Sequence, residues 1–364
     1  MKVGILTFHH TTNYGATLQA YALWTTIKRY GHDVEIIDYR PYVGVKFYIE
    51  KILYRDDSVN PYWIPELVKA FKMRRFLLSK MDLSKRKAYR RAGLKNFDGQ
   101  YDVVICGSDQ VWCFNSFRGF NPSFFLDFVG RETKCLKISY APSFNTIESL
   151  GKYRDLISEL LSDFDAISVR DCHSLQVLRQ ECNIEATRVL DPTFLIEYTG
   201  ILSVPKLKEE YLLAYVEPLN LEQEKFVKSI AERQNLVIIS VGNYIEVADK
   251  NLIGISPEEW LGYFSKASYI VTNTYHGTIF SIIFRKMFTV LAKEGKGNKT
   301  NDLLRLLGLE SRVLSEGELG SWQETFSPID YKAVCNKLEK EISWSKTYLS
   351  EALEGRSIYP QAVE

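Results

Sequence analysis

A single histidine stands at a junction where chemistry could take place. His276 lies in "TNTYHGTIFSIIF" (272–284), after the apolar run 268–271 and before an apolar helical stretch. At neutral pH an imidazole can act as a general acid or base. The neighbouring Gly277 lets a ligand approach the backbone at a helix N-terminus. The alternative for His276 is a hydrogen-bonded histidine of the core.

Polar side chains follow several other apolar runs of the sequence in the same way. In open α/β sheets, ligands bind beyond the carboxyl ends of the strands, so these positions are the first candidates for a site. The candidates are His9 to Asn13 after 1–8, Ser108 and Asp109 after 101–106, Ser143 after 136–141, Arg170 after 166–169, Asp191 after 187–190 and Asn273 to Gly277 after 269–272.

Each candidate also has a structural interpretation. Asn13, Ser143 and Thr274 are residue types that cap helices or make turns. Asp109 could cap a helix beginning at Gln110. Arg170 needs an anionic partner, because a guanidinium directly after a buried strand is costly to leave unpaired. A structural ion pair and an anion ligand are equally open for it.

The elements that would position these residues alternate between strands and helices. The chain opens with a strand (1–8), a helix from Gly15 that Gly31 ends, and a second strand (32–38), although the G-x-G-x-x-G fingerprint is missing. The alternation predicts parallel α/β structure. We therefore expect an α/β fold of two Rossmann-like domains that face one another across a cleft.

The predicted domain boundary lies near residue 200, where prolines and "KLKEE" interrupt the pattern. We expect an N-terminal domain over 1–200 with a basic helical insertion at about 60–97, and a C-terminal domain over 201–330. Ser256, Pro257 and Glu259 predict a capping box at a helix start in the second half. A final helix within 331–364 could return to the first domain.

Composition excludes several classes of protein. The net charge of +1 predicts no general attraction to nucleic acid. Six cysteines without a C-x-x-C pair argue against zinc and disulfides and favour a reducing compartment. No apolar run approaches the length of a membrane span or a signal h-region. We expect a cytoplasmic protein without a metal site or cofactor.

One segment is strongly basic. Residues 69–95 hold eleven Lys and Arg against Asp82 alone, which makes the segment +10 and the remainder −9. Leu67, Phe71, Leu78 and Met81 can share one face of a helix that packs on the first domain with a solvated charged side. The alternative is a surface that meets anionic lipid headgroups or a pyrophosphate-linked acceptor, which would place the protein peripherally at the inner membrane face.

Six motifs together resemble the polysaccharide pyruvyl transferase family over residues 3 to about 310. They are "NYGATLQAYAL" (13–23), "CGSDQVW" (106–112), "SYAPSF" (139–144), "ISVRD" (167–171), "VLDPTFL" (189–195) and "TNTYHGTIFSIIF" (272–284). The resemblance implies two Rossmann-like domains arranged as in GT-B glycosyltransferases. It also implies transfer of the enolpyruvyl unit of phosphoenolpyruvate to hydroxyls of a sugar, with formation of a pyruvate ketal and release of phosphate.

The resemblance also assigns roles to residues. Arg170 would hold the carboxylate or phosphate of phosphoenolpyruvate, and His276 would lie near the phosphate as ligand or proton donor. Asp109 is our candidate for deprotonating the sugar hydroxyl. The further candidates for substrate binding are Asn13, Gly15, Ser108, Ser143, Thr274, Tyr275 and Gly277. The acceptor would be a surface polysaccharide or its precursor, which could be linked to a polyprenyl pyrophosphate.

The sequence departs from some branches of the family at one position. They carry an arginine two residues before the histidine, where this chain has Thr274. Lys293, Lys296, Lys299 or Arg285 could supply the missing cation. Two alternatives to a pyruvyl transferase are a GT-B-type glycosyltransferase that uses a nucleotide sugar and a catalytically silent binding protein of the same fold.

Overall fold

The computed structural model describes residues 1–55, 58–292, 298–319 and 327–356, which contacts group into two compact units. Unit 1 comprises Met1–Ser58, Leu77–Ile196 and Glu339–Glu364. Unit 2 comprises Val59–Phe76 and Glu197–Leu338. Two long helices, α3 (Trp63–Lys80) and α11 (Tyr331–Leu353), each contribute residues to both units.

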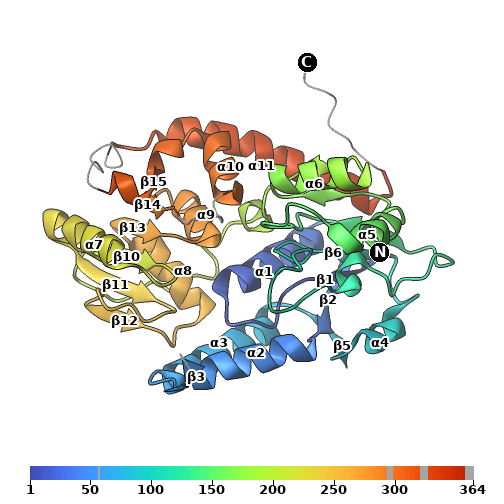
Figure 1. The fold of residues 1–364 in the computed structure, drawn as a ribbon, viewed down its shortest axis with the longest axis horizontal. Helices are drawn as coiled ribbons and strands as arrows, with labels where there is room; N and C mark the ends of the chain where they lie inside the picture. The colour runs from blue at the N-terminus through green and yellow to red at the C-terminus, as the bar shows by residue number, and fades with distance from the viewer. Residues whose placement is uncertain (56–57, 293–297, 320–326, 357–364) are drawn as a thin grey trace. The chain divides into compact units, whose positions relative to one another are not determined.

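Unit 1 is built on a parallel sheet with the strand order β5-β2-β1-β6-β7 (Figure 1). An isolated bridge between Ile138 and Ala166 continues the sheet toward a small pair, β8 and β9. The strands are β1 (Lys2–Leu6), β2 (Asp33–Tyr39), β5 (Leu83–Ala88), β6 (Val103–Cys106), β7 (Leu136–Ser139), β8 (Ser168–Val169) and β9 (Thr187–Arg188). Every residue of β6 and all of β1 after Lys2 are buried, as in a sheet covered on both faces.

The helices of unit 1 begin and end at chemically defined residues. Asn13 caps α1 by accepting a hydrogen bond from the Ala16 N–H at 3.2 Å, and Gly31 follows the helix end with a positive φ of 86°. The last part of α11 belongs to this core, where Tyr348 donates to the Ser139 carbonyl at 3.0 Å. The helices are α1 (Tyr14–Arg29), α2 (Tyr42–Leu53), α4 (Arg91–Leu94), α5 (Arg154–Leu161) and α6 (Cys172–Cys182).

Unit 2 repeats the pattern with a parallel sheet in the order β12-β11-β10-β13-β14-β15 (Figure 1). Its strands are β10 (Tyr211–Tyr215), β11 (Val237–Val241), β12 (Lys250–Leu252), β13 (Tyr269–Thr272), β14 (Met287–Leu291) and β15 (Val313–Leu314). Its helices are α7 (Leu221–Gln234), α8 (Pro257–Lys266), α9 (Tyr275–Ile283) and α10 (Asn298–Leu307). The predicted capping box of α8 is confirmed, because Ser256 and Glu259 each accept the other's backbone N–H.

Both sheets have the doubly wound strand order, in which the chain reverses direction once across the sheet. The reversal lies between β1 and β6 in unit 1 and between β10 and β13 in unit 2. The predicted fold class, α/β with two Rossmann-like parts, is confirmed. It stays a prediction that the segments 1–200, 201–330 and 331–364 fold as separate domains. The two compact units interleave along the chain.

The basic segment differs from the predicted amphipathic helix. Helix α3 ends at Lys80, and β5 follows as the edge strand of unit 1, with Lys85, Arg86 and Lys87 exposed. Two short strands, β3 (Tyr54–Arg55) and β4 (Ser58–Val59), pair with each other ahead of α3. The apolar face predicted to pack is also wrong for three of its members: Leu67, Phe71 and Leu78 are exposed, and only Met81 is buried.

Candidate functional site

The carboxyl edge of the unit 1 sheet is tied together where the strand order reverses. Thr7 follows β1, and its hydroxyl donates to the Ser108 carbonyl after β6 at 2.8 Å. Between them, Gly107 has no room for a side chain, because a Cβ would come within 2.9 Å of Thr7. The two strand ends are therefore held in direct contact at the usual ligand position of this fold.

Arg170 forms a buried ion-pair cluster at this edge. Its side chain is inaccessible to solvent, and its guanidinium donates to Asp191 at 3.0 Å and to Asp109 at 3.3 Å. Asp191 is equally buried, and Asp109 is 15% exposed. The sequence left two alternatives for Arg170, a structural ion pair and an anion ligand. These contacts are those of a structural ion pair. Its role as a ligand of the donor stays a prediction.

Asp109 and two serines complete this cluster. Asp109 has a positive φ of 84°, a strained backbone for a residue with a side chain. The Asp109 carboxylate accepts a hydrogen bond from the Gln110 N–H at 2.8 Å. Its backbone carbonyl accepts one from the Ser143 N–H at 2.9 Å. Ser108 donates to the Ala141 carbonyl at 2.9 Å. The structure thus brings Ser108, Asp109, Ser143 and Arg170 together.

Two structural interpretations of these residues are settled by the backbone. The helix that Asp109 was expected to cap is not formed, because residues 110–112 make turns. Ser143 is a turn residue whose hydroxyl accepts the Asn145 N–H at 3.0 Å. Asn13 is the cap of α1, and Gly15 is buried in the first turn of that helix.

A second charged group lies beside β1 and β2, where the candidate His9 meets Asp38 and Arg40, two residues that the sequence analysis missed. His9 and Asp38 are buried, and Nε2 of His9 lies 3.1 Å from the Asp38 carboxylate. Arg40 donates two hydrogen bonds to the same carboxylate, each at 2.6 Å. Burial alone would raise the pKa of Asp38, but the hydrogen bonds from His9 and Arg40 outweigh burial and hold it well below its usual range.

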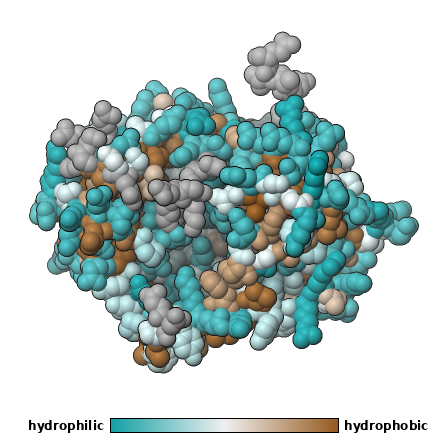
Figure 2. Space-filling model, in the orientation of Figure 1, coloured by the Kyte–Doolittle hydropathy of each residue, from teal (hydrophilic) through white to brown (hydrophobic). Residues whose placement is uncertain are grey.

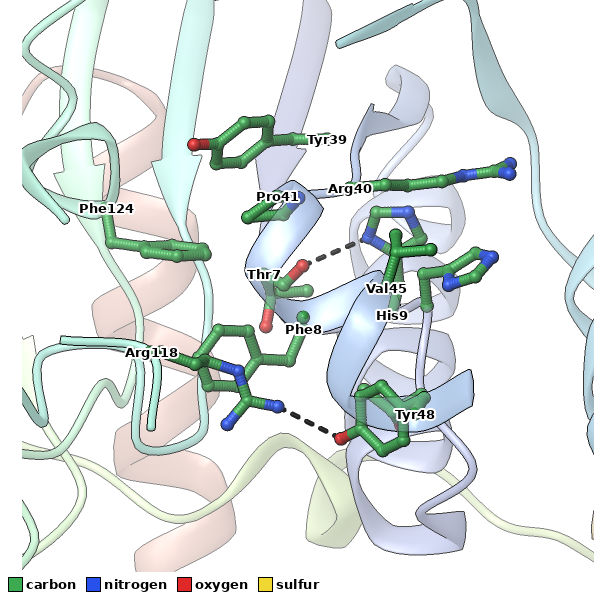
Figure 3. A pocket seen from close by; sticks show the side chains of 13 residues that line it. Thr7, Phe8, His9, Tyr39, Arg40, Pro41, Val45, Tyr48, Arg118 and Phe124 are labelled. Atoms are coloured by element: carbon green, nitrogen blue, oxygen red, sulfur yellow. Dashed lines mark hydrogen bonds between the residues drawn. The ribbon is translucent and has the colours of Figure 1, made fainter. Parts of the chain in front are cut away.

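His9 and Arg40 line a pocket at the edge of unit 1, shown in Figure 3. Its cavity volume is about 30 Å³, roughly the room of one or two water molecules, and the larger empty space of about 370 Å³ around it includes open solvent. Helix α2 forms one wall. The pocket is lined by Thr7, Phe8, His9, His10, Thr11, Tyr39, Arg40, Pro41, Gly44, Val45, Tyr48, Arg118 and Phe124.

Arg118 is the cation in the pocket wall without a carboxylate beside it. Its guanidinium lies 4.2 Å from the ring centre of Phe8 and 4.3 Å from that of Phe117. It donates to the Tyr48 hydroxyl at 3.0 Å, as Figure 3 shows. Burial raises the pKa of Tyr48, so this phenol stays neutral at pH 7 and leaves the guanidinium charge uncompensated. Among the described residues, no carboxylate forms an ion pair with Arg118, which can therefore bind an anionic group.

The unit 2 edge centres on the start of α9. The hydroxyl of Thr272 donates to the Tyr215 carbonyl at 2.6 Å across the point where this sheet reverses its order. Thr274 caps α9 by accepting the Gly277 N–H at 3.0 Å, so its interpretation as a cap is confirmed. A Cβ on Gly277 would come within 2.1 Å of the Thr272 hydroxyl, which explains the glycine.

His276 is the second residue of α9 and is 8% exposed. The ring of Tyr275 packs edge-on against it, with the ring centres 5.5 Å apart. The first turn of α9 contains no acidic residue, so the positive end of the helix dipole is not neutralised there. Such a helix start can hold an anion through its backbone N–H groups, with an imidazole beside it as proton donor.

The proposed substitutes for the missing arginine differ in position. Lys299 lies near the start of α9, with its ammonium 5.6 Å from the Tyr275 ring centre. Arg285 follows the C-terminal end of α9, about 13 Å along the axis from its start, so it does not replace a cation beside His276. Lys293 and Lys296 lie outside the described residues.

No site for a metal ion is formed by three or more His, Cys, Asp or Glu side chains within the described ranges. No helix in the same ranges combines the length and apolarity needed to cross a bilayer.

The charged pair at the unit 1 edge that the sequence analysis missed had one visible signal. Asp38 and Arg40 flank the end of an apolar strand two residues apart, a charged pair where burial would otherwise be expected.

Comparisons with known proteins agree with this geometry. Residues 13–293 match the model of a family described as polysaccharide pyruvyl transferase. No curated protein matches the chain. A putative UDP-N-acetylglucosamine 2-epimerase from Listeria monocytogenes has a similar fold, with a TM-score of 0.54, 10% identity and 99% of each chain covered. S. aureus MnaA in a co-structure with UDP gives a TM-score of 0.52 and 11% identity over 97% of this chain and 96% of that one. At these identities the likeness concerns the GT-B-like fold alone.

Proposed function

Because the chain belongs to the polysaccharide pyruvyl transferase family, and is therefore a transferase, we propose that its donor is phosphoenolpyruvate. Two hydroxyls of one sugar add to C2 of the enolpyruvyl unit, and the C2–O bond to phosphate breaks. One hydroxyl proton is balanced by protonation of the methylene carbon, and the other leaves with phosphate. The products are a pyruvate ketal and inorganic phosphate.

The observation that supports this proposal most is the start of α9. It sets His276 beside backbone N–H groups in a turn without acidic residues, directly after β13. The phosphate of the donor would accept hydrogen bonds there, and the imidazole would protonate the methylene carbon or the leaving phosphate. Lys299 is the described cation best placed to add charge.

Unit 1 carries two further candidate residues. Asp109 remains our candidate for deprotonating the sugar hydroxyl, although its carboxylate already pairs with Arg170. Arg118 would bind an anionic group of a substrate in the pocket of Figure 3. We propose an acceptor that belongs to a surface polysaccharide or to its polyprenyl-pyrophosphate-linked precursor, and a cytoplasmic reaction without metal or cofactor.

A His276→Gln variant tests the proposal, with phosphate release from phosphoenolpyruvate and candidate glycan acceptors as the measurement. We expect kcat to fall about 100- to 10,000-fold, because general acid catalysis contributes that much. The matched control is His173→Gln. His173 is bonded to the Ile147 carbonyl at 2.8 Å in unit 1, so its loss should lower stability and leave kcat unchanged.

Two results would contradict the proposal. One is ketal formation at the normal rate by His276→Gln with an unchanged melting temperature. The other is calorimetric binding of a nucleotide sugar without any binding of phosphoenolpyruvate, which would instead support the glycosyltransferase alternative.

A further inference from the structure

The exposed hydrophobic side chains of the molecule are concentrated in one segment. Twelve of the nineteen large hydrophobic residues that are exposed in the described part of the chain lie between residues 42 and 78. Scattered exposed hydrophobics are normal in soluble proteins, but a concentration of this kind marks an interaction surface. In Figure 2, hydrophobic side chains reach the surface near the end of α2 beside β3.

Helix α2 has two different faces. Its inner face lines the pocket of unit 1 through Gly44, Val45 and Tyr48. None of its residues is buried, and its outer face carries Tyr42 (68% exposed), Val43, Ile49 and Leu53. The spacing of these four residues, which we call the α2 stripe, places them along one side of the helix, which also carries the exposed Lys46–Glu50 ion pair.

Helix α3 has a lysine on its buried side and large hydrophobic residues on its exposed side, the reverse of an ordinary surface helix. Lys69 is buried and donates to the Gly242 carbonyl at 2.7 Å, and Met73 and Phe76 are buried on the same side. The opposite side carries Ile64, Leu67, Val68, Phe71 and Leu78, which we call the α3 stripe, with exposures from 41% to 68%. A helix that buries a lysine and exposes a phenylalanine presents an apolar surface of the kind that marks an interaction site.

A basic edge accompanies the α2 stripe in unit 1. Strand β5 is the edge strand, and its Lys85, Arg86 and Lys87 are exposed. Within the described ranges these three side chains form no ion pair with a carboxylate, and Arg86 bonds only to the Asn96 carbonyl. The N–H of Tyr42 donates to the Tyr89 carbonyl at 3.3 Å, which fixes the start of α2 beside the end of this basic strand.

We propose that the α2 stripe docks on a lipid bilayer whose anionic headgroups meet the basic edge of β5, and that the α3 stripe makes a bilayer contact of its own. Amphipathic helices with aromatic and aliphatic residues on one side and lysine or arginine nearby lie in the interface of such bilayers. Each cation near the surface contributes to the attraction. A protein partner with an acidic rim would need fixed complementary charges, whereas a bilayer of anionic lipids accepts exposed cations that lack carboxylate partners, as on β5.

Vesicle co-sedimentation of the full chain tests the proposal without any substrate, so its outcome is separate from that of the proposed reaction. The vesicles are pure phosphatidylcholine and equal parts phosphatidylcholine and phosphatidylglycerol. We expect binding to the anionic vesicles that weakens with salt. Leu67→Ser with Phe71→Ser should reduce it at least tenfold, and Lys85→Ser with Lys87→Ser also by about tenfold or more.

The matched control is Leu156→Ser with Leu221→Ser, which removes two exposed leucines outside this surface and should bind like the wild type. A second measurement uses Trp63, which is 40% exposed at the start of α3. Its fluorescence should shift to the blue with anionic vesicles, and Trp63→Phe should remove the shift. All variants should keep the melting temperature, because the positions are exposed.

Three results would overturn the proposal. One is no sedimentation with either vesicle, and another is unchanged binding by both double variants. The third is a dimer of the free chain that Leu67→Ser with Phe71→Ser converts to a monomer, without vesicle binding. That result would make a second copy of the chain the occupant of the surface.

Discussion

In both units, a threonine hydroxyl donates a hydrogen bond to a backbone carbonyl across the point where the strand order reverses. Thr7 bonds across the reversal of one sheet at 2.8 Å, and Thr272 does so across the other at 2.6 Å. The charged residues around these two hydrogen bonds differ between the units. In unit 1 the charges beside the reversal are paired within the protein, Arg170 with two carboxylates and Asp38 with Arg40 and the imidazole of His9. In unit 2 the start of α9 presents His276 without an acidic neighbour in its turn.

The comparison teaches that polar residues at strand ends have two uses that look alike in sequence. In unit 1 most of them hold loops in place, so their loss should cost stability. In unit 2 they leave an N-terminal helix turn ready for an anion, so their loss should cost activity. Arg118 is the exception in unit 1, since it is a cation held by aromatic rings instead of carboxylates.

The largest expected effect in unit 1 follows from Arg170→Met. It leaves the buried carboxylate of Asp191 and the partly exposed carboxylate of Asp109 without their cation, which should cost about 3–5 kcal/mol of unfolding free energy. Urea denaturation measures the change. The matched control is Arg131→Gln, because Arg131 also pairs with two carboxylates but is 62% exposed, so its loss should cost less than about 1 kcal/mol.

This experiment also decides between the two roles of Arg170. If Arg170→Met keeps the wild-type stability and raises the KM for phosphoenolpyruvate, the cluster is a donor site and the contrast between the units is wrong. Adding Asp191→Asn to Arg170→Met should restore part of the lost stability, since one of the two stranded charges is removed.

A smaller loss is expected for Asp38→Asn, which weakens the charged hydrogen bonds to His9 and Arg40. We expect a loss of about 2–3 kcal/mol at pH 7. Because the folded protein lowers the pKa of Asp38, its contribution is present above the unfolded pKa of about 4 and disappears as the pH falls below it. Thermal unfolding of both proteins from neutral to acidic pH should therefore show a difference that shrinks toward low pH.

The control for this series is Asp82→Asn, whose carboxylate is 63% exposed beside Lys28 and should shift the melting temperature little at any pH. A stability difference between Asp38→Asn and wild type that grew as the pH fell would contradict the assigned charge state of Asp38.

The smallest effect concerns Arg118→Gln, which removes the uncompensated cation of the pocket. We expect the KM of one substrate to rise roughly tenfold, or about 1.4 kcal/mol, with stability unchanged. Comparing the KM for phosphoenolpyruvate with that for the acceptor shows which substrate the pocket holds. The control Tyr48→Phe keeps the charge and should have a weaker effect. Unchanged KM values for both substrates would remove the pocket from the site.

Much of the fold could be predicted because its strands are apolar runs. The stretches 101–106 and 211–216 contain β6 and β10, and Ser256 with Glu259 marks the start of α8. Strand β5 could not be predicted in this way. It is an edge strand with three exposed cations, so its sequence lacks the apolar pattern of a buried strand. The orientation of α3 also depends on Lys69 finding a carbonyl partner 173 residues away.

The candidate site could be predicted by position but not by pairing. Asn13 and Thr274 were recognisable as caps, because capping depends on residues three positions away. The partners of Arg170 lie 21 and 61 residues away in sequence, and those distances carry no periodic signal. Arg118 is equally hidden, since it owes its position to Phe8 and Tyr48 on other elements.

Helix α11 has a consequence for the way the chain is made. Unit 1 contains β1, yet its core also needs Tyr348 and Leu349, which are translated only after the residues of unit 2. The Leu190 N–H is without its partner until Ser345 exists. Domains usually fold in the order of their synthesis, but the core of unit 1 can be completed only after the residues of unit 2 have been synthesised.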